Sequence, residues 1–128
     1  MPVTLHIGRS GEFFAASVLE QMGVKSSHID ITDDDLWCLS SDGEMVRVQV
    51  KSTRSIAKER RSATDPAYRF TLGRQLYSYD GIYIFVALDI RVCIARRFHG
   101  KTPSTLRIRS GKFTQQNERE SIEREFSL

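Results

Sequence analysis

The chain has 128 residues, of which 40% are hydrophobic and 27% are charged, a composition typical of one soluble domain with its own core. The apolar content excludes a disordered chain, and the longest apolar run, at residues 82–88, is too short for a membrane span of about 20 residues. The amino terminus shows no charged-then-apolar leader, and two cysteines are too few for a disulfide scaffold, so we expect a cytoplasmic protein.

The formal net charge of +3 conceals an uneven distribution of charge along the chain. Residues 1–50 hold 3 basic and 8 acidic side chains, whereas residues 51–117 hold 14 basic and 4 acidic ones. Between Ile90 and Asn117 there are seven Lys or Arg residues and no carboxylate. Basic stretches of this kind occur on surfaces that bind nucleic acids, because contacts with phosphates release counterions. On charge alone, a solvated basic face is an equally good interpretation.

An amphipathic helix is the first predicted element. Apolar residues recur at helical spacing from Phe14 to Met22, and Ser10 is a suitable cap before them. Gly23 follows the last apolar residue, where a helix is expected to end. We therefore expect a helix from Ser10 to about Met22 with one buried face.

Three strands are predicted after this helix, at residues 28–32, 36–39 and 45–52. Asp42 and Gly43 favour a tight hairpin between the second and third of them. In the third strand, valines at positions 46, 48 and 50 alternate with polar residues, as expected where one face of a strand is buried. Trp37, in the second strand, is interpreted as a core residue.

The second half of the chain predicts further strands and a terminal helix. Residues 53–66 are polar and predict a loop or a mobile flap over the basic region, followed by a short strand at 68–71 and one or two helical turns at 74–77. The apolar run at 82–88 is typical of a central strand covered on both faces, and residues 91–95 are expected to pair with it. A short strand at 106–108 lies in the basic, irregular segment 96–112, and Thr114 can cap a helix over 115–126.

This order of elements predicts an α/β fold, α-β-β-β-α-β, with a mixed central sheet flanked by helices. We expect a single domain over residues 1–128, in which 99–128 form a basic C-terminal extension with the terminal helix. Cys38 and Cys93 are interpreted as small buried hydrophobic residues.

Four polar side chains are placed where they can converge. Glu12 lies in the first turn of the predicted helix, Asp35 begins the second strand, and Gln49 and Lys51 share one face of the third. Because nearly equal numbers of residues separate Asp35 and Lys51 from the hairpin turn, we expect the two to be neighbours across the ladder.

A set of this composition suits the hydrolysis of a phosphodiester bond. Mg²⁺ takes oxygen ligands, and carboxylates, a side-chain amide and a strand carbonyl, here that of Val50, can supply them. The ion polarises the phosphate and lowers the pKa of a bound water molecule. A nearby lysine can stabilise the charge that develops or orient the nucleophile.

The segment DLWCLSSDGEMVRVQVKST, preceded by GRSGEFFAASVLEQMG, resembles the PD-(D/E)XK nuclease superfamily. The most similar branches are the group I intron homing endonucleases and the Holliday-junction resolvases, and the resemblance covers about residues 8–95. It implies a restriction-endonuclease-like core and an endonuclease that cuts DNA with Mg²⁺ or Mn²⁺. The residues at the family's catalytic positions are Glu12, Asp35, Gln49 and Lys51, and the metal ligands are Asp35, Glu12, Gln49 and the carbonyl of Val50.

Two departures from the family pattern leave alternatives open. No proline precedes the aspartate, so Asp33 or Asp34 could be the metal ligand, although Asp35 is preferred because it directly precedes the apolar strand. Gln49 stands where a second acid is usual, as it does in the homing branch, and a neutral amide weakens metal affinity. A catalytically inactive nuclease-fold module that binds nucleic acid or a protein is therefore the alternative, and a nuclease that needs a partner subunit is a third possibility.

The resemblance implies double-stranded or branched DNA as the partner, and no membrane. A homodimer or a homotetramer would supply two sites for the two strands. The basic stretch that includes Arg107 and Arg109 favours phosphate contacts, because no acid lies near it in the sequence. The residues expected to contact nucleic acid are Ser52, Thr53, Arg54, Lys58, Arg60, Arg61, Arg96, Arg97 and Lys101.

Overall fold

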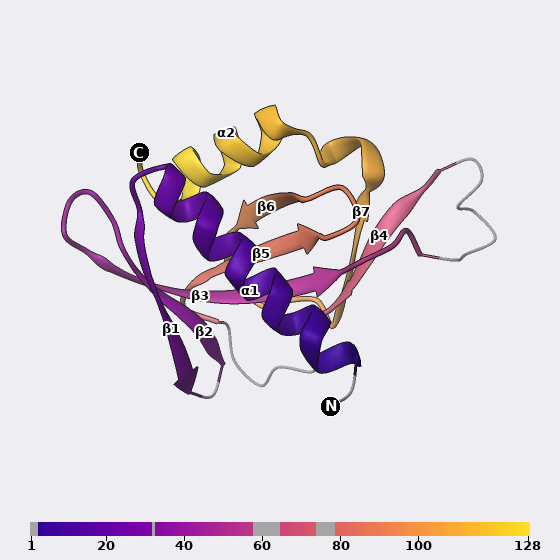
Figure 1. Ribbon diagram of the computed structural model, residues 1–128, viewed down its shortest axis with the longest axis horizontal. Coiled ribbons are helices and arrows are strands. Elements are labelled where there is room, and N and C mark those ends of the chain that lie inside the picture. Colours follow the sequence, from indigo (N-terminus) through magenta and orange to yellow (C-terminus); the bar gives the residue numbers. More distant parts are fainter. Residues whose placement is uncertain (1–2, 32, 58–64, 74–78) are drawn as a thin grey trace.

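The computed structural model describes residues 3–31, 33–57, 65–73 and 79–128 of the chain (Figure 1). Within these ranges it contains two α-helices, seven strands and one 3-10 helix. In chain order the elements are α1 (Val3–Gln21), β1 (Lys25–Ile31), β2 (Asp34–Leu39), β3 (Met45–Thr53), β4 (Ala67–Thr71), β5 (Ile82–Ala87), β6 (Val92–Arg96), β7 (Thr105–Arg109), η1 (Ser110–Lys112) and α2 (Gln115–Glu125).

Five of the strands form one mixed sheet in the order β1-β2-β3-β5-β6. Neighbouring strands run antiparallel except β3 and β5, which run parallel. β4 and β7 pair antiparallel and form a separate two-stranded sheet, called the β4–β7 ribbon below. The predicted α/β fold, with a mixed sheet and flanking helices, is confirmed.

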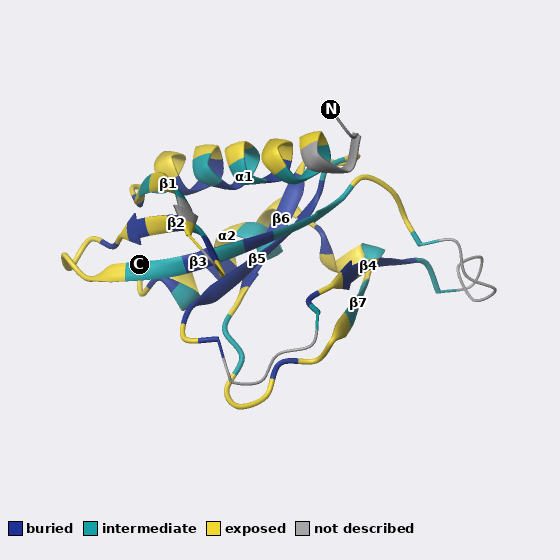
Figure 2. Ribbon diagram, turned by 90° about the horizontal axis from the view of Figure 1, so that it is seen from below, coloured by how far each residue is buried: buried dark blue, intermediate teal, exposed yellow. Residues whose placement is uncertain are grey.

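Each face of the five-stranded sheet carries its own hydrophobic core. On one face α1 packs across the strands, with Leu19 fully buried, and α2 contributes Ile122 and Phe126 (Figure 1). On the other face Tyr83 and Phe85 pack against aromatic residues of the β4–β7 ribbon and its flanking segments (Figure 2). Because both faces are covered, every residue of β5 is buried, as the continuous apolar run predicted.

The helix α2 closes the β6 edge of the sheet. Thr114 caps the helix by accepting a hydrogen bond from the backbone N–H of Asn117, as expected from the sequence. Glu118 and Ser121 of α2 accept hydrogen bonds from the outward N–H groups of Cys93 and Ala95, at 2.8 and 3.0 Å. An edge strand that would otherwise offer free donors is thus protected by side chains. Neither described helix is long and apolar enough to cross a membrane.

Two expectations for the amino-terminal half are wrong. The first helix begins at Val3 rather than Ser10, so Ser10 is not a cap and Glu12 lies in the middle of the helix. In the sequence, a proline directly precedes Val3, and proline is well tolerated at the beginning of a helix. Trp37 is 36% exposed and outside the core, and its indole N–H donates to Asp34.

The remaining elements agree with the sequence to within a few residues. The Asp42–Gly43 hairpin joins β2 and β3, and Gly43 has a φ of 86°, which a glycine adopts without strain. Cys38 and Cys93 are buried thiols. The predicted helical turns at 74–77 and the middle of the predicted flap lie outside the described residues.

Candidate functional site

The candidate site is built where β2 and β3 stop pairing. The last regular pair of their ladder is Leu36 with Val48. Beyond it, the carboxylate of Asp35 replaces the missing backbone partner, since its Oδ2 accepts a hydrogen bond from the N–H of Val50 at 2.7 Å. The N–H and C=O of a strand residue point to the same edge, so the carbonyl of Val50 is directed to the same side as Asp35.

Gln49 and Lys51 lie on the face of β3 that turns away from α1. Gln49 is directly opposite Tyr83 of β5, and Lys51 is opposite Phe85. The Oε1 atom of Gln49 is buried and has no hydrogen-bond partner within the part of the chain that the structure describes. Because a buried acceptor without a partner costs free energy, such an atom indicates a place for a ligand.

Asp34 has a different environment from its neighbour Asp35. Its carboxylate is buried and accepts hydrogen bonds from Nε of Arg47 at 2.9 Å, from the hydroxyl of Tyr79 at 2.7 Å and from the indole of Trp37 at 2.8 Å. We call Asp34, Trp37, Arg47 and Tyr79 the Asp34 cluster. Both carboxylate oxygens are used within this cluster, whereas the contact of Asp35 with β3 leaves its Oδ1 free of hydrogen bonds with described residues. Asp33 is exposed in the preceding turn, with a φ of 74°.

The pKa values of the two adjacent carboxylates are shifted in opposite directions. Burial raises the pKa of Asp35 above its usual value, and the N–H of Val50 and the charge of Lys51 offset this only in part. Burial also acts to raise the pKa of Asp34, but hydrogen bonds from Arg47, Trp37 and Tyr79 outweigh it and the net shift is downward. Asp34 is therefore a stabilised anion, whereas the ionised form of Asp35 lacks full compensation.

Asp35→Asn is expected to stabilise the metal-free protein at pH 7. The amide keeps an oxygen for the N–H of Val50 and removes the poorly compensated charge, so we expect a gain on the order of 1 kcal/mol. Because folding raises the pKa of Asp35, its protonated carboxyl contributes fully to stability below the pKa of the unfolded state. This contribution is lost as the pH rises through the pKa of the folded state. The advantage of the variant should therefore vanish near pH 3.

Urea unfolding in EDTA at pH 7 and pH 3 measures this difference, and Asp33→Asn in the exposed turn is the matched control. A variant that is less stable than the unchanged protein at pH 7 would contradict the environment assigned to Asp35.

Glu12 is brought to β3 by a close approach of α1. A Cβ on Gly11 would lie 1.6 Å from Oγ of Ser52 and 2.7 Å from its Cβ, so only glycine permits this contact. Ser52 directly follows Lys51, and the half-buried Glu12 directly follows Gly11. The helix backbone at Glu12 thus lies beside β3 at Ser52, on the α1 side of the sheet, whereas Gln49 and Lys51 lie on the opposite face.

The donor set fits a hard divalent cation. Asp35 offers a carboxylate oxygen, Gln49 a buried amide oxygen that is unpartnered among the described residues, and Val50 a backbone carbonyl. Oxygen ligands of these kinds suit Mg²⁺ or Mn²⁺. The described residues contain no cluster of three or more His, Cys, Asp or Glu side chains that could hold a metal ion. Any metal held here would therefore depend on the amide and the carbonyl as well as on carboxylates.

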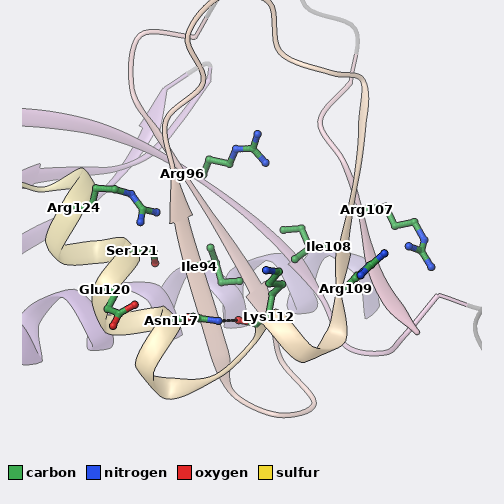
Figure 3. Close-up of a pocket in the computed structure, with 10 residues that line it drawn as sticks. All are labelled: Ile94, Arg96, Arg107, Ile108, Arg109, Lys112, Asn117, Glu120, Ser121 and Arg124. Atoms are coloured by element: carbon green, nitrogen blue, oxygen red, sulfur yellow. Dashed lines mark hydrogen bonds between the residues drawn. The ribbon is translucent and has the colours of Figure 1, made fainter. Parts of the chain in front are cut away.

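The residues expected to contact nucleic acid fall into separate regions. Ser52, Thr53 and Arg54 line a pocket of about 380 Å³ where β3 ends beside α1, and Oγ of Ser52 is buried without a partner among described residues. Arg96 lines a second pocket, of about 410 Å³, between β6, β7 and α2 (Figure 3). Arg97 lies 3.8 Å from Asp80, and Lys101 is exposed in the loop after β6. Lys58, Arg60 and Arg61 lie outside the described residues.

No protein-family model and no curated protein matches the chain. Among solved structures, that of a bacterial homing endonuclease, I-Ssp6803I, is similar over 84% of this chain and 76% of its own length. The TM-score is 0.63 and the sequence identity is 16%. At this identity the likeness shows the fold: the mixed sheet with its helices is arranged as in a homing endonuclease.

Proposed function

We propose that the protein is a metal-dependent endonuclease that hydrolyses phosphodiester bonds of DNA, with Asp35, Gln49, Lys51 and Glu12 as the catalytic residues of a PD-(D/E)XK-type site. The observation that carries this proposal is the junction of β2 and β3. There the Asp35 carboxylate accepts a hydrogen bond from the N–H of Val50 and is influenced by the charge of Lys51, and the buried Oε1 of Gln49 has no hydrogen-bond partner among the described residues. The homing-endonuclease fold of the chain supports the same reaction class.

Asp35, Gln49 and the carbonyl of Val50 would hold Mg²⁺, which when bound polarises the scissile phosphate and acidifies a water molecule. Glu12 is assigned to the metal by the family pattern, since α1 packs on the sheet face opposite to Gln49. Lys51, on the same strand face as Gln49, would stabilise negative charge on the phosphate and orient the attacking water. A bond forms between the water oxygen and phosphorus, the bond from phosphorus to the leaving sugar oxygen breaks, and that oxygen takes up a proton.

The partner in this proposal is double-stranded or branched DNA in the cytoplasm. One chain supplies one candidate site, so cutting both strands of a duplex requires either two chains or two successive events. A homodimer or homotetramer supplies the sites symmetrically. Cross-linking followed by sizing in solution measures the number of chains.

The experiment is the incubation of the purified chain with supercoiled plasmid, a four-way DNA junction and RNA, each in Mg²⁺, Mn²⁺ or EDTA. We expect nicked or linear DNA in the metal-containing reactions, no product in EDTA and no cleavage of RNA. No metal-dependent product on any DNA substrate would exclude the proposed activity.

A second candidate function is binding without cleavage. It is favoured by the neutral amide at Gln49 and by the lack of a cluster of three metal-binding side chains among the described residues. For this function we expect the chain to bind DNA equally well in Mg²⁺ and in EDTA, and to leave every substrate intact.

A further inference from the structure

The β4–β7 ribbon presents an outward face that its packing does not explain. Its inward residues, such as Phe70 and Ile108, belong to the second core. The register pairs Ala67 with Arg109, Arg69 with Arg107 and Thr71 with Thr105 on the opposite face. Apart from Ala67, this outward face consists of guanidinium and hydroxyl groups.

Two arginines stand directly opposite each other on this face. Arg69 of β4 pairs with Arg107 of β7, and Arg109 follows two residues along the same strand. Like charges directly opposite one another in an antiparallel pair are destabilising. Residues that are unfavourable for the stability of the fold occur mainly at functional sites, so this pair of arginines indicates a binding surface.

Among the described residues, the carboxylate of Asp65 offsets this charge in part. Asp65 lies 3.2 Å from Arg107 and 3.3 Å from Arg109. Arg69 is exposed and forms no ion pair or hydrogen bond within the described ranges of the chain. In Figure 3, the guanidinium groups of Arg107 and Arg109 point away from α2, whereas Ile108 points toward Ile94 of β6. Counted over the described residues, the face therefore carries more positive than negative charge.

From this arrangement we infer that the outward face of the β4–β7 ribbon binds in the major groove of duplex DNA and reads base edges there. This inference rests on the proposed function and names the element that would select its DNA. The major groove, about 12 Å wide, admits a two-stranded ribbon. Arginine binds the O6 and N7 acceptors of guanine, and threonine offers a hydroxyl and a methyl group to base edges.

The spacing along the ribbon also matches duplex DNA. Outward residues on one strand recur every second position, which is about 6.8 Å, or about two base-pair steps of 3.4 Å. Two cross-strand pairs on this face would then contact bases about two steps apart: Arg69 with Arg107, and Thr71 with Thr105. Because β4 packs beside β3, a ribbon in the groove brings the duplex to the strand that carries Lys51.

The test is binding in EDTA at 0.15 M salt, where no cleavage occurs. A pool of 30-base-pair duplexes with randomised centres is selected with the unchanged protein, with Arg69→Ala and with Lys25→Ala. Lys25 is the matched control, since it is an exposed lysine of β1, an edge strand of the other sheet. Fluorescence anisotropy then gives the Kd for the duplex that the unchanged protein prefers.

We expect Arg69→Ala to weaken binding at least tenfold and to relax the base preference at one position, while Lys25→Ala changes neither. Thermal unfolding should show an equal or higher Tm for Arg69→Ala, because the variant relieves the repulsion with Arg107. A double-stranded RNA of the preferred sequence has a major groove too deep and narrow for a ribbon, so its binding should not depend on Arg69.

Three results would overturn the inference: no duplex binding by the unchanged protein, an unaltered Kd and base preference in Arg69→Ala, or an equal loss of binding to RNA and DNA. Cleavage is measured separately in Mg²⁺, so the two proposals fail independently. Sequence-selective binding through the ribbon without cleavage would refute only the proposed nuclease activity. Metal-dependent cleavage with binding that does not depend on Arg69 would refute only the proposed role of the ribbon.

Discussion

Replacing Lys51 with alanine is expected to abolish metal-dependent DNA cleavage and to leave DNA binding close to that of the unchanged protein. The side chain lies on the same face as Gln49 and its charge acts on Asp35, so its loss removes a positive charge from the proposed reaction centre. Removing one group that stabilises charge in a transition state typically costs about 10²–10³-fold in rate. One lysine among many basic residues adds little to the affinity for a whole duplex.

The comparison uses the initial rate of plasmid nicking in Mg²⁺ and the Kd for a duplex in EDTA. Lys25→Ala, which removes an exposed lysine from β1, is the matched control and should cut like the unchanged protein. Lys51→Ala that nicks plasmid at the normal rate would remove Lys51 from the mechanism. A parallel loss of DNA binding would assign the lysine to binding rather than to chemistry.

Asp34→Asn is expected to destabilise the protein by about 3 kcal/mol at pH 7. The Asp34 carboxylate is 4% exposed and accepts from three donors, so an amide would turn an N–H₂ group toward an N–H or O–H that has no other acceptor in the cluster. Arg47 is 36% exposed and recovers some hydration, which keeps the cost below that of a fully buried pair. For a domain of this length, the loss corresponds to a decrease in Tm of roughly 10 °C.

The pH dependence of this effect distinguishes the ion pair from packing. Because the pKa of Asp34 is lowered by folding, its contribution is present above the unfolded value of 3.8 and is lost as pH falls through the folded value. The difference between Asp34→Asn and the unchanged protein should therefore shrink on acidification, whereas a packing defect would persist. Urea unfolding at pH 7 and pH 3 measures it, with Asp33→Asn as a neighbouring control and Tyr79→Phe as the loss of a single donor. A cost below about 0.5 kcal/mol at pH 7 would show that the cluster does not hold β2 in place.

The strands of the central sheet were predictable because their signals are local. Alternation in β3, the Asp-Gly turn and the apolar run of β5 each follow from residues within a single element. The hairpin also predicted Asp35 and Lys51 as neighbours across the ladder, but pairing ends at Leu36 with Val48, and this register sets Asp35 level with Gln49 rather than with Lys51. In these parts of the fold, the conformation that the local sequence favours is the same as the one that tertiary packing requires.

Features that depend on distant contacts were not predictable. The contrast between the environments of Asp34 and Asp35 depends on Arg47 and Tyr79, and Tyr79 lies 45 residues from Asp34 in the chain. The pairing of Arg69 with Arg107 joins strands separated by two strands of another sheet. Trp37 lies outside the core because its indole N–H donates to Asp34, whereas apolar size alone predicts burial.

Mn²⁺ binding measured by electron paramagnetic resonance tests the proposed metal site most directly. The concentration of free Mn²⁺ is measured during titration of the unchanged chain, of Asp35→Asn and of Asp33→Asn. Circular dichroism checks that each protein is folded. The account predicts saturable binding to the unchanged chain and to Asp33→Asn, and affinity lower by at least tenfold in Asp35→Asn. Equal Mn²⁺ affinity in Asp35→Asn, or no binding by the unchanged chain, would contradict it.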